Sequence, residues 1–259
     1  MSNSIQTLNQ NISIKYGQVY RLGRHLLCNG DARDTELVNR VIGKTKITAA
    51  ILDPPYGTKT VELKKNFSKL KTPKIILNDD ITSEKEYTKF TENWLKPLLP
   101  HLAVKNSLYI FNSDAMIFAL REGMENAGVH FSQLLIWIKN QAIIGRKDYL
   151  PMHELVAYGW FKKHWPLRAK DKSVLFCPKP SKSPIHPTQK PVALIRRLIL
   201  NSTLPGDVLY DSFSGSSTLG VAAEQAQRSS ILIERDEKYC LATIERFKRV
   251  FNIDAKLIK

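Results

Sequence analysis

The stretch Ile47-Thr48-Ala49-Ala50-Ile51-Leu52-Asp53-Pro54-Pro55-Tyr56 sets the fold that the rest of the chain completes. Its first six residues form a short apolar run, which predicts a buried strand. Each proline fixes its own φ and restrains the residue before it, so the strand ends in a stiff turn that carries an acid and an aromatic ring. The Asp53 carboxylate and the Pro54 carbonyl suit holding a planar base by its amino group, and Tyr56 suits stacking on it. Asp-Pro-Pro is also a common end to a strand, so these residues alone leave an ordinary turn open.

Strands and helices alternate on both sides of this turn. Before it, Val19–Leu22 and His25–Cys28 predict a hairpin, and Asp31 or Asp34 can cap a helix over 35–42. Residues 1–16 are expected to be frayed, and the lysine-rich residues 57–80 are expected to form a mobile loop. The later pattern predicts strands at 107–112, 130–139, 154–158, 208–210 and 230–233, and helices at 84–99, 115–126, 191–201, 218–226 and 237–250. This alternation predicts the α/β class with a mainly parallel central sheet.

Composition narrows the class of protein further. The 259 residues suffice for one large α/β domain or for a domain with an inserted lobe, and a hydrophobic content of 43% argues against global disorder. The sequence has no apolar run of the roughly 18 residues that span a bilayer and no signal-peptide core, so a cytoplasmic protein is expected. Cys28, Cys177 and Cys240 are far apart, which predicts neither a disulfide framework nor a metal site.

The positive charge of the chain is unevenly distributed. Its formal value is +15, and the segment from Lys139 to Lys190 holds eleven Lys or Arg residues against three acids, or +8 of that total. A second basic stretch, at 59–74, follows the Asp53 turn. The clustering favours a nucleic-acid partner over a uniformly cationic surface. The candidate DNA-binding residues are Lys59, Lys64, Lys65, Lys139, Arg146, Lys147, Lys162, Lys163 and Arg168.

Residues 140–185 interleave these cations with aromatic side chains and show little periodicity. That pattern suits contact with a groove and packing on base faces. The alternative is an ordinary irregular lobe whose aromatics fill a small core. We expect both, with Trp160 mainly structural and the cations facing DNA.

A second candidate site lies in the segment Val208–Ala226. A strand is followed by Asp211, a turn of small residues and a helix, and the next strand ends in Glu234. A helix N-terminus after a tight turn favours a nucleotide or another polar, ribose-bearing ligand, and an acid at the end of the next strand can accept from two ribose hydroxyls. Only Gly215 stands where a dinucleotide fingerprint needs three glycines, so a ligand without phosphates fits better.

Several motifs in the same order resemble those of the amino-group DNA methyltransferases, which methylate the exocyclic amine of adenine or cytosine. Asp53-Pro54-Pro55-Tyr56 resembles their catalytic motif, and Asp211-Ser212-Phe213-Ser214-Gly215-Ser216-Ser217-Thr218 resembles their methionine-binding loop. His186-Pro187-Thr188-Gln189-Lys190-Pro191 resembles the segment that lines their cofactor pocket. Smaller similarities are Gly30-Asp31, Trp137-Ile138-Lys139 and His153-Glu154.

The resemblance implies a Rossmann-like methyltransferase fold with S-adenosylmethionine as cofactor. The catalytic motif precedes the cofactor loop, which is the permuted order of the β group. The implied division is a catalytic half at 17–139, a small inserted target-recognition lobe at 140–185 and a cofactor-binding half at 186–251. The implied cofactor-binding residues are Asp31, Ala32, Asp53, Thr188, Lys190, Pro191, Asp211, Phe213, Ser214, Gly215, Ser216, Thr218, Glu234 and Arg235. Ser212 and Ser217 replace the usual Pro and Gly, and these departures bear on cofactor affinity.

The resemblance also implies a mechanism. Hydrogen bonds from the amine to Asp53 and to the Pro54 carbonyl would localise a lone pair that is otherwise delocalised into the ring, with no metal and no covalent nucleophile. The base must leave the duplex to reach the turn, where Tyr56 would stack on it and residues 57–80 would close over it or hold phosphates. An Asp at the first motif position is the usual adenine form, whereas the cytosine-amine enzymes more often have Ser. N6 of adenine in duplex DNA is therefore the expected target.

Several other functions stay open at this point. An enzyme of the same fold could methylate N4 of cytosine or an RNA base. It could also methylate a protein amide, but enzymes of that kind usually have Asn rather than Asp at the position of Asp53. A different class of protein, a DNA-binding module with an inactive cofactor pocket, is disfavoured by the presence of Asp53, Tyr56, Asp211 and Glu234. Relatives also suggest two partners besides DNA, a second copy of the chain and a cognate restriction endonuclease. A DNA substrate implies a nucleoid-associated location.

Overall fold

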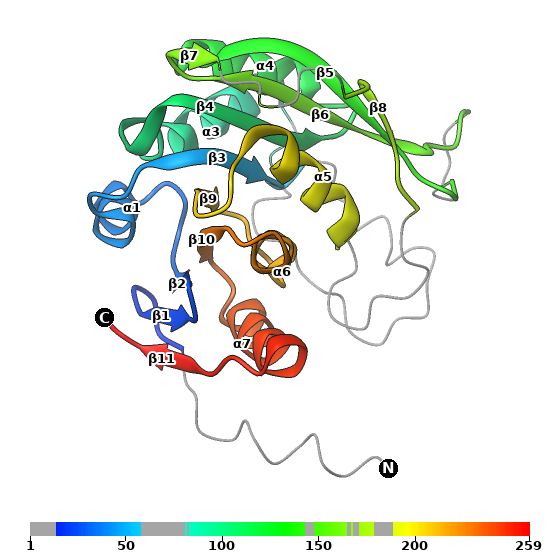
Figure 1. The fold of residues 1–259 in the computed structure, drawn as a ribbon. Helices are drawn as coiled ribbons and strands as arrows, with labels where there is room; N and C mark the ends of the chain where they lie inside the picture. Colours follow the sequence, from blue (N-terminus) through cyan, green and yellow to red (C-terminus); the bar gives the residue numbers. More distant parts are fainter. Residues whose placement is uncertain are drawn as a thin grey trace, which may run out of the picture.

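The computed structural model describes residues 14–57, 81, 83–142, 148–164, 167, 171–178 and 189–259. Within these residues, eleven strands form a sheet in the order β11-β1-β2-β10-β9-β3-β4-β6-β5-β8, with β7 paired to β4 beside this path (Figure 1). The strands are β1 (Val19–Leu22), β2 (His25–Asn29), β3 (Ile47–Leu52), β4 (Leu102–Asn112), β5 (His130–Ile138), β6 (His153–Trp160), β7 (Lys163–His164), β8 (Val174–Phe176), β9 (Val208–Asp211), β10 (Ser229–Glu234) and β11 (Ala255–Leu257).

The centre of the sheet is parallel. β2, β10, β9, β3 and β4 pair in parallel, whereas β6 runs antiparallel between β4 and β5. The chain leaves β3 towards β4 on one side and leaves β9 towards β10 on the other. The connections therefore reverse direction between β3 and β9, which is where open α/β sheets bind ligands, outside the carboxyl ends of their strands.

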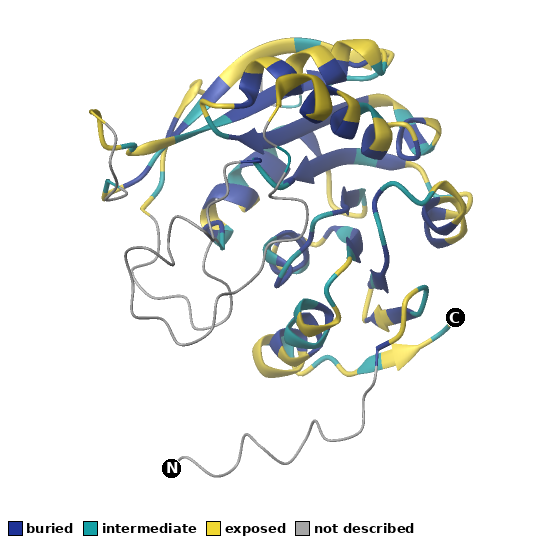
Figure 2. Ribbon diagram, turned by 180° about the vertical axis from the view of Figure 1, so that it is seen from behind, coloured by how far each residue is buried: buried dark blue, intermediate teal, exposed yellow. Residues whose placement is uncertain are grey.

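Helices cover both faces of the sheet. They are α1 (Thr35–Ile42), α3 (Glu84–Leu95), α4 (Ile117–Asn126), α5 (Val192–Ser202), α6 (Thr218–Gln225) and α7 (Glu237–Phe251), with a short 3-10 turn η1 (Leu99–His101) before β4. The helices α1, α3 and α4 pack on one core, which takes Ala50 and Leu52 of β3. The helices α5, α6 and α7 pack on a second core, which takes Ala49 and Ile51. The strand is thus buried on both faces (Figure 2), which explains its unbroken apolar run.

Most of the predicted elements are confirmed within a few residues. The hairpin and the first helix form as expected, and the Asp34 side chain caps that helix by accepting from the Leu37 amide. The helix expected at 84–99 ends at Leu95, two residues before Pro97, as the missing amide and restricted backbone of proline would predict. The frayed start expected at 1–16 is wrong at its end, because Ile14 is buried against the second core. The predicted mobile loop at 57–80 lies outside the described residues, apart from Gly57.

The expected lobe at 140–185 contains a full strand of the central sheet. β6 was predicted as a short strand at 154–158 but runs from His153 to Trp160 between β4 and β5. The described residues on either side of it lie at different ends of the sheet. Residues 148–152 and Phe176 are near the carboxyl end of β5, whereas β7 pairs with the amino end of β4. The described parts of residues 140–185 therefore belong to the central sheet and extend its edge.

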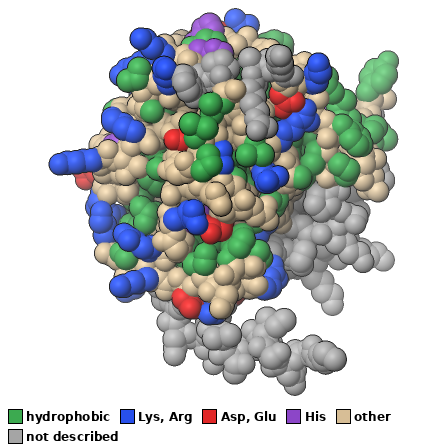
Figure 3. Space-filling view, viewed as in Figure 1, with side chains coloured by type: hydrophobic (Ala, Val, Ile, Leu, Met, Phe, Trp, Pro, Cys, Tyr) green, Lys and Arg blue, Asp and Glu red, His purple; other side chains and the backbone are tan. Residues whose placement is uncertain are grey.

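The surface shows two features that bear on partners. On the face shown in Figure 3, Lys and Arg side chains are spread over the described surface, while hydrophobic side chains gather near the ends of β5, β6 and β8. The exposed apolar residues of that region are Tyr149, Leu150, Met152, Val174 and Phe176. No described helix is both long and apolar enough to cross a bilayer. Among the described residues, no group of His, Cys, Asp or Glu is arranged to hold a metal ion.

Candidate active site

Two turns meet where the central strands β3 and β9 end. The strands pair in parallel, with Ala49 opposite Leu209 and Ala50 opposite Tyr210. Asp53 comes three residues after Ala50, and Asp211 comes directly after Tyr210, so both acids lie at the same edge of the sheet. The two motifs, which are about 150 residues apart in the sequence, are therefore neighbours in space.

The turn after β3 is held by hydrogen bonds on several sides. The Tyr56 hydroxyl lies 2.8 Å from Asp53 Oδ1 and 3.0 Å from Glu154 Oε2, so it can donate to either carboxylate. The Tyr87 hydroxyl donates to the Pro55 carbonyl at 2.8 Å, and it accepts from the Asn112 side-chain amide at 2.9 Å. Burial, together with the charges of Asp53 and Glu154, raises the pKa of Tyr56 well above its usual value. The phenol is therefore protonated and its ring is fixed relative to Asp53.

Gly57 closes this turn for a steric reason. Its φ is +64°, which L side chains rarely adopt, and a Cβ there would lie 2.0 Å from the Ile81 carbonyl oxygen. Only glycine lets the main chain of Ile81 pass so closely behind the catalytic motif.

Two lysines and two acids surround the turn. Lys190 Nζ lies 2.6 Å from Asp53 Oδ2 and 3.2 Å from Glu154 Oε2, while Lys139 Nζ lies 2.8 Å from Glu154 Oε1. Burial would raise the pKa of Glu154, but Lys190 and Lys139 outweigh it and lower that pKa to about 2. Burial would likewise lower the pKa of Lys190, and the carboxylates of Asp53 and Glu154 raise it instead. All four side chains are paired ions whose charges cancel.

The turn after β9 is a compact loop with a buried acid at its head. The Phe213 amide donates to Asp211 Oδ1 at 2.9 Å, and the Phe213 ring packs edge-on against Trp94 of α3 at 5.4 Å between ring centroids. The Gly215 carbonyl accepts from Thr243 and the Ser216 carbonyl accepts from Arg246, both on α7. Burial raises the pKa of Asp211 well above its usual value, with smaller contributions from Asp53 and Glu234. Among the described residues, the Phe213 amide is the hydrogen-bond donor to the Asp211 carboxylate. A ligand that is cationic or donates hydrogen bonds would therefore stabilise the ionised carboxylate.

Glu234 ties the end of β10 to the same loop. Its Oε2 accepts from the Gly215 amide at 2.7 Å and its Oε1 accepts from the Asp236 amide at 2.8 Å. Burial raises the pKa of Glu234 to about 7, although the backbone amides lower it. The described loop also holds three buried hydroxyls without a hydrogen-bond partner, those of Ser212, Ser214 and Ser217. Such groups suit a polar ligand with several donors and acceptors.

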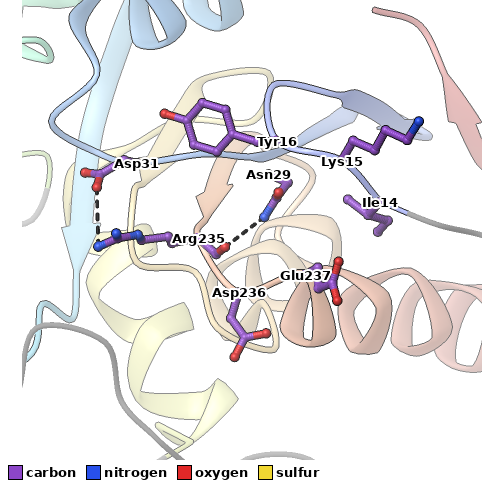
Figure 4. A pocket seen from close by; sticks show the side chains of 8 residues that line it. All are labelled: Ile14, Lys15, Tyr16, Asn29, Asp31, Arg235, Asp236 and Glu237. Carbon is purple, nitrogen blue, oxygen red and sulfur yellow. Dashed lines mark hydrogen bonds and ion pairs between the residues drawn. The ribbon is translucent and has the colours of Figure 1, made fainter.

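A pocket of about 740 Å³ opens beside the ends of β2 and β10 (Figure 4). Its lining residues are Ile14, Lys15, Tyr16, Asn29, Asp31, Arg235, Asp236 and Glu237. Arg235 Nη1 lies 3.6 Å from Asp31 Oδ2, and the Asn29 amide donates to the Arg235 carbonyl at 3.0 Å. The pocket thus contains two of the predicted cofactor-binding residues, Asp31 and Arg235. The contribution of residues 14–16 was missed, because a short polar stretch before a hairpin carries no distinctive signal.

The structure gathers most of the predicted site residues at this one edge of the sheet. They are Asp31, Ala32, Asp53, Pro54, Pro55, Tyr56, Lys190, Pro191, Asp211, Phe213, Ser214, Gly215, Ser216, Thr218, Glu234 and Arg235. Pro191 caps α5 and Thr218 begins α6. Thr188, Lys59, Lys64, Lys65, Arg146, Lys147 and Arg168 lie outside the described residues.

The structure describes three of the predicted DNA-binding lysines, and it contradicts this role for one of them, Lys139. Lys139 is 1% exposed and pairs with Glu154, so it is not on a phosphate-facing surface. Lys162 and Lys163 are exposed. In the sheet, the backbone of Lys163 in β7 lies opposite that of Lys105, near the amino end of β4. The catalytic turn follows Leu52, which is opposite Ile110. At about 3.3 Å per residue, the five residues from Lys105 to Ile110 place the two lysines roughly 17 Å or more back along the sheet from the turn.

The comparisons with known proteins agree with this arrangement. A model of the DNA methylase family matches residues 47–245, which is more than half of the chain. The chain belongs to the DNA methylase family. Its matched segment runs from the start of β3 through both turns and into α7.

Individual relatives show the same kinship. The chain is 27% identical over 236 residues to the Type II methyltransferase M.HpaI of Haemophilus parainfluenzae, which covers 81% of this chain and 70% of the relative. It is 27% identical over 241 residues to the Type II methyltransferase M.HinfI of Haemophilus influenzae, which covers 82% of this chain and 66% of the relative.

Solved structures show the Rossmann-like methyltransferase fold. The crystal structure of the M1.HpyAVI–SAM complex superposes with a TM-score of 0.62 at 25% identity, over 85% of this chain and 98% of that one. The cytosine-N4-specific PvuII DNA methyltransferase superposes with a TM-score of 0.70 at 17% identity, over 92% and 91% of the two chains, a likeness of fold alone. The predicted fold and the predicted cofactor, S-adenosylmethionine, are thereby confirmed, and DNA methylation is the activity of the family.

Proposed function

We propose that this DNA methyltransferase transfers the methyl group to N6 of adenine in duplex DNA. The observation that carries the proposal is the carboxylate of Asp53 at the head of the turn, next to the cofactor loop that follows β9. A carboxylate there accepts a hydrogen bond from an exocyclic amine and also balances the positive charge that the amine nitrogen gains during methyl transfer.

The residues that would hold S-adenosylmethionine lie at the edge formed by the ends of β2, β10 and β9. Glu234 would accept from the ribose hydroxyls, the pocket around Asp31 and Arg235 would take the adenine end, and Asp211 with the serine hydroxyls of the loop would take the amino-acid end. When bound, S-adenosylmethionine supplies an electrophilic methyl group on a sulfonium. Burial raises the pKa of both Asp211 and Glu234, which fits a ligand that brings hydrogen-bond donors and positive charge to these carboxylates.

The remaining steps belong to the protein's own residues. The target base leaves the duplex, and Tyr56, whose hydroxyl is fixed by Asp53 or Glu154, stacks on it. Asp53 and the Pro54 carbonyl accept from the amine and localise its lone pair towards the methyl group. The amine nitrogen becomes positively charged as it gains the methyl group, Asp53 balances this charge, and one N–H proton then passes to solvent water. Positioning and electrostatics therefore account for most of the rate gain.

DNA is held from the same edge of the sheet. The described parts of the target-recognition region that lie at this edge are residues 148–152 and β8, where Tyr149 and Phe176 are exposed. Exposed aromatic and apolar side chains beside a base-flipping site can pack on unstacked bases. We assign target recognition to these residues and to Arg146 and Lys147, which the sequence predicts to contact DNA.

The proposal extends to partners and location. The curated relatives are Type II methyltransferases, so a cognate restriction endonuclease is a proposed partner, and a homodimer is a second one. Light scattering of the purified protein measures the oligomeric state. A chromosomal substrate places the enzyme with the nucleoid in the cytoplasm.

The test is direct. Unmethylated plasmid DNA is incubated with the protein and S-adenosylmethionine, and its nucleosides are analysed by mass spectrometry. N6-methyladenine is the expected product, and N4-methylcytosine without methyladenine would contradict the proposal. Parallel reactions with RNA and with single-stranded DNA test the duplex requirement. Asp53→Ala should lower kcat by about 10²–10³-fold, the usual effect of removing one preorganised hydrogen bond to a developing charge.

A further inference from the structure

The four charged side chains around the catalytic turn form a chain of ion pairs in the order Lys139, Glu154, Lys190 and Asp53. Lys139 contacts Glu154 Oε1, Glu154 Oε2 lies 3.2 Å from Lys190, and Lys190 lies 2.6 Å from Asp53 Oδ2. The Tyr56 hydroxyl lies 2.8 Å from Asp53 Oδ1. Both oxygens of the carboxylate that is to receive the target amine therefore already have a donor beside them.

Lys190 competes most directly with the incoming amine. Its ammonium contact at 2.6 Å is a short, charge-assisted hydrogen bond. A buried ammonium that is left without a carboxylate partner is strongly destabilised. Lys190 can therefore release Asp53 only if another anion takes its charge.

Glu154 is placed to take that charge. Its Oε2 already lies 3.2 Å from Lys190 Nζ, at the long end of hydrogen-bond distances, so a shift of a few tenths of an ångström would shorten this contact to that of a charge-assisted hydrogen bond. The rings of Tyr56 and Phe111 lie 5.3 and 5.1 Å from the same nitrogen and favour a cation beside them. Lys139, which is fully buried, holds the other oxygen of Glu154 and fixes the direction in which the carboxylate points.

We propose that Glu154 is a positioning residue that receives the Lys190 ammonium when the target amine binds Asp53. This inference rests on the proposed role of Asp53 and is independent of whether the base is adenine or cytosine. Lys190 is shared between two carboxylates, and the incoming amine shifts it from one to the other. The net charge of the cluster stays constant while Asp53 becomes available.

Charge-balanced variants test the exchange. Glu154→Gln alone leaves an excess buried cation, so the informative variant is Lys139→Met/Glu154→Gln, which removes one charge of each sign. Lys190 then has Asp53 as its only anion of the cluster. We expect kcat/KM for plasmid DNA to fall at least tenfold, while the Kd for S-adenosylmethionine changes less than twofold and the thermal unfolding curve stays cooperative.

The decisive measurement is the effect of Lys190→Met in two backgrounds. In the Lys139→Met/Glu154→Gln background, it should raise kcat/KM several-fold, because it removes the competitor of the amine. In the native background it should lower kcat/KM, because Lys190 also belongs to the site that holds Asp53 and Glu154. Equal effects in both backgrounds would overturn the exchange, as would a Lys139→Met/Glu154→Gln variant with native kcat/KM.

A second measurement does not depend on the variants' folding. A crystal structure of the native protein with sinefungin and a methylatable duplex should show Lys190 Nζ within 3.0 Å of Glu154 and beyond 3.5 Å from Asp53 Oδ2. Lys190 still at 2.6 Å from Asp53 with the target amine bound would overturn the inference. Full turnover by Asp53→Ala would overturn the proposed catalytic role as well, whereas an inactive Asp53→Ala variant with a static Lys190 would overturn the exchange alone.

Discussion

Replacing Ser217 with glycine should stabilise the free protein by relieving backbone strain at the end of the cofactor loop. Ser217 precedes α6 with φ +60° and ψ +57°, a left-handed conformation, and its side chain makes no capping hydrogen bond. Its hydroxyl is buried and has no hydrogen-bond partner among the described residues. The side chain therefore brings backbone strain without a polar contact in return.

The expected gain follows from two opposing effects. The left-handed conformation costs a residue with a Cβ about 1–2 kcal/mol. Glycine makes the unfolded chain more flexible, which costs about 0.4–1 kcal/mol in stability. The net expectation for Ser217→Gly is a gain of up to about 1 kcal/mol, or a Tm higher by roughly 2–4 °C for a chain of this size.

A double-mutant cycle with Gly220 makes the test specific. A Cβ on Gly220 would lie 2.3 Å from Ser217 Oγ, and 3.0 Å from both Leu232 Cδ1 and Phe247 Cζ. Gly220→Ala should therefore destabilise the native protein more than it destabilises Ser217→Gly, with a coupling on the order of 1 kcal/mol. Urea unfolding with tryptophan fluorescence measures all four proteins. A loss of more than about 1 kcal/mol in Ser217→Gly, or no coupling with Gly220→Ala, would refute the reasoning.

Three further predictions test other parts of the site. Burial raises the pKa of Glu234 to about 7, and ribose hydroxyls favour its ionised form, so the Kd for S-adenosylmethionine should fall by up to tenfold per pH unit from pH 5 to 7 and then level off. Calorimetry that shows a constant Kd over this range, or the same pH dependence in Glu234→Gln, contradicts this prediction. Gly57→Ala should abolish methyl transfer through its clash with Ile81, whereas Gly43→Ala, with a similar φ of +59° and open space around it, should lose only stability; equal activity losses would be inconsistent with the clash. Lys162→Ala should change neither the DNA affinity nor its salt dependence, both measured by fluorescence anisotropy. A plot of log affinity against log salt concentration whose slope is smaller by about one would instead show that Lys162 contacts a phosphate.

The sequence patterns predicted the central part of the fold well, for a physical reason. β3 and β9 are short apolar strands followed by turns whose composition is set by local chemistry, two prolines in one and small residues in the other. Such patterns depend only on residues that are close in the sequence, so they can be read without knowledge of the tertiary structure. The alternation of strands and helices predicted a mainly parallel sheet but not which strands are neighbours, so the pairing of β3 with β9 is known from the structure.

The rest of the site depends on contacts that no local pattern encodes. Lys139 and Lys162 look alike in a basic segment, yet one is buried beside Glu154 and the other lies towards the opposite end of the sheet. The strand β6 between them reverses the chain, so residues on its two sides separate by the length of the strand. Charge counting assigns both lysines to DNA, and only the topology distinguishes them. The close pass of Ile81 behind Gly57 is likewise a long-range contact.

The position of β9 and β10 has a consequence for how the protein is made. β2 and β3 follow one another in the chain through α1, yet β10 and β9 lie between them in the sheet. During synthesis, all residues before Val208 emerge first, and until β9 arrives the apolar edges of β2 and β3 have no native partner. Unpaired apolar edges favour aggregation, and pairings between distant segments form slowly. Insertion of the last fifth of the chain therefore closes the sheet and joins the two turns in the same event, so a truncated translation product would have open edges and no methyltransferase activity.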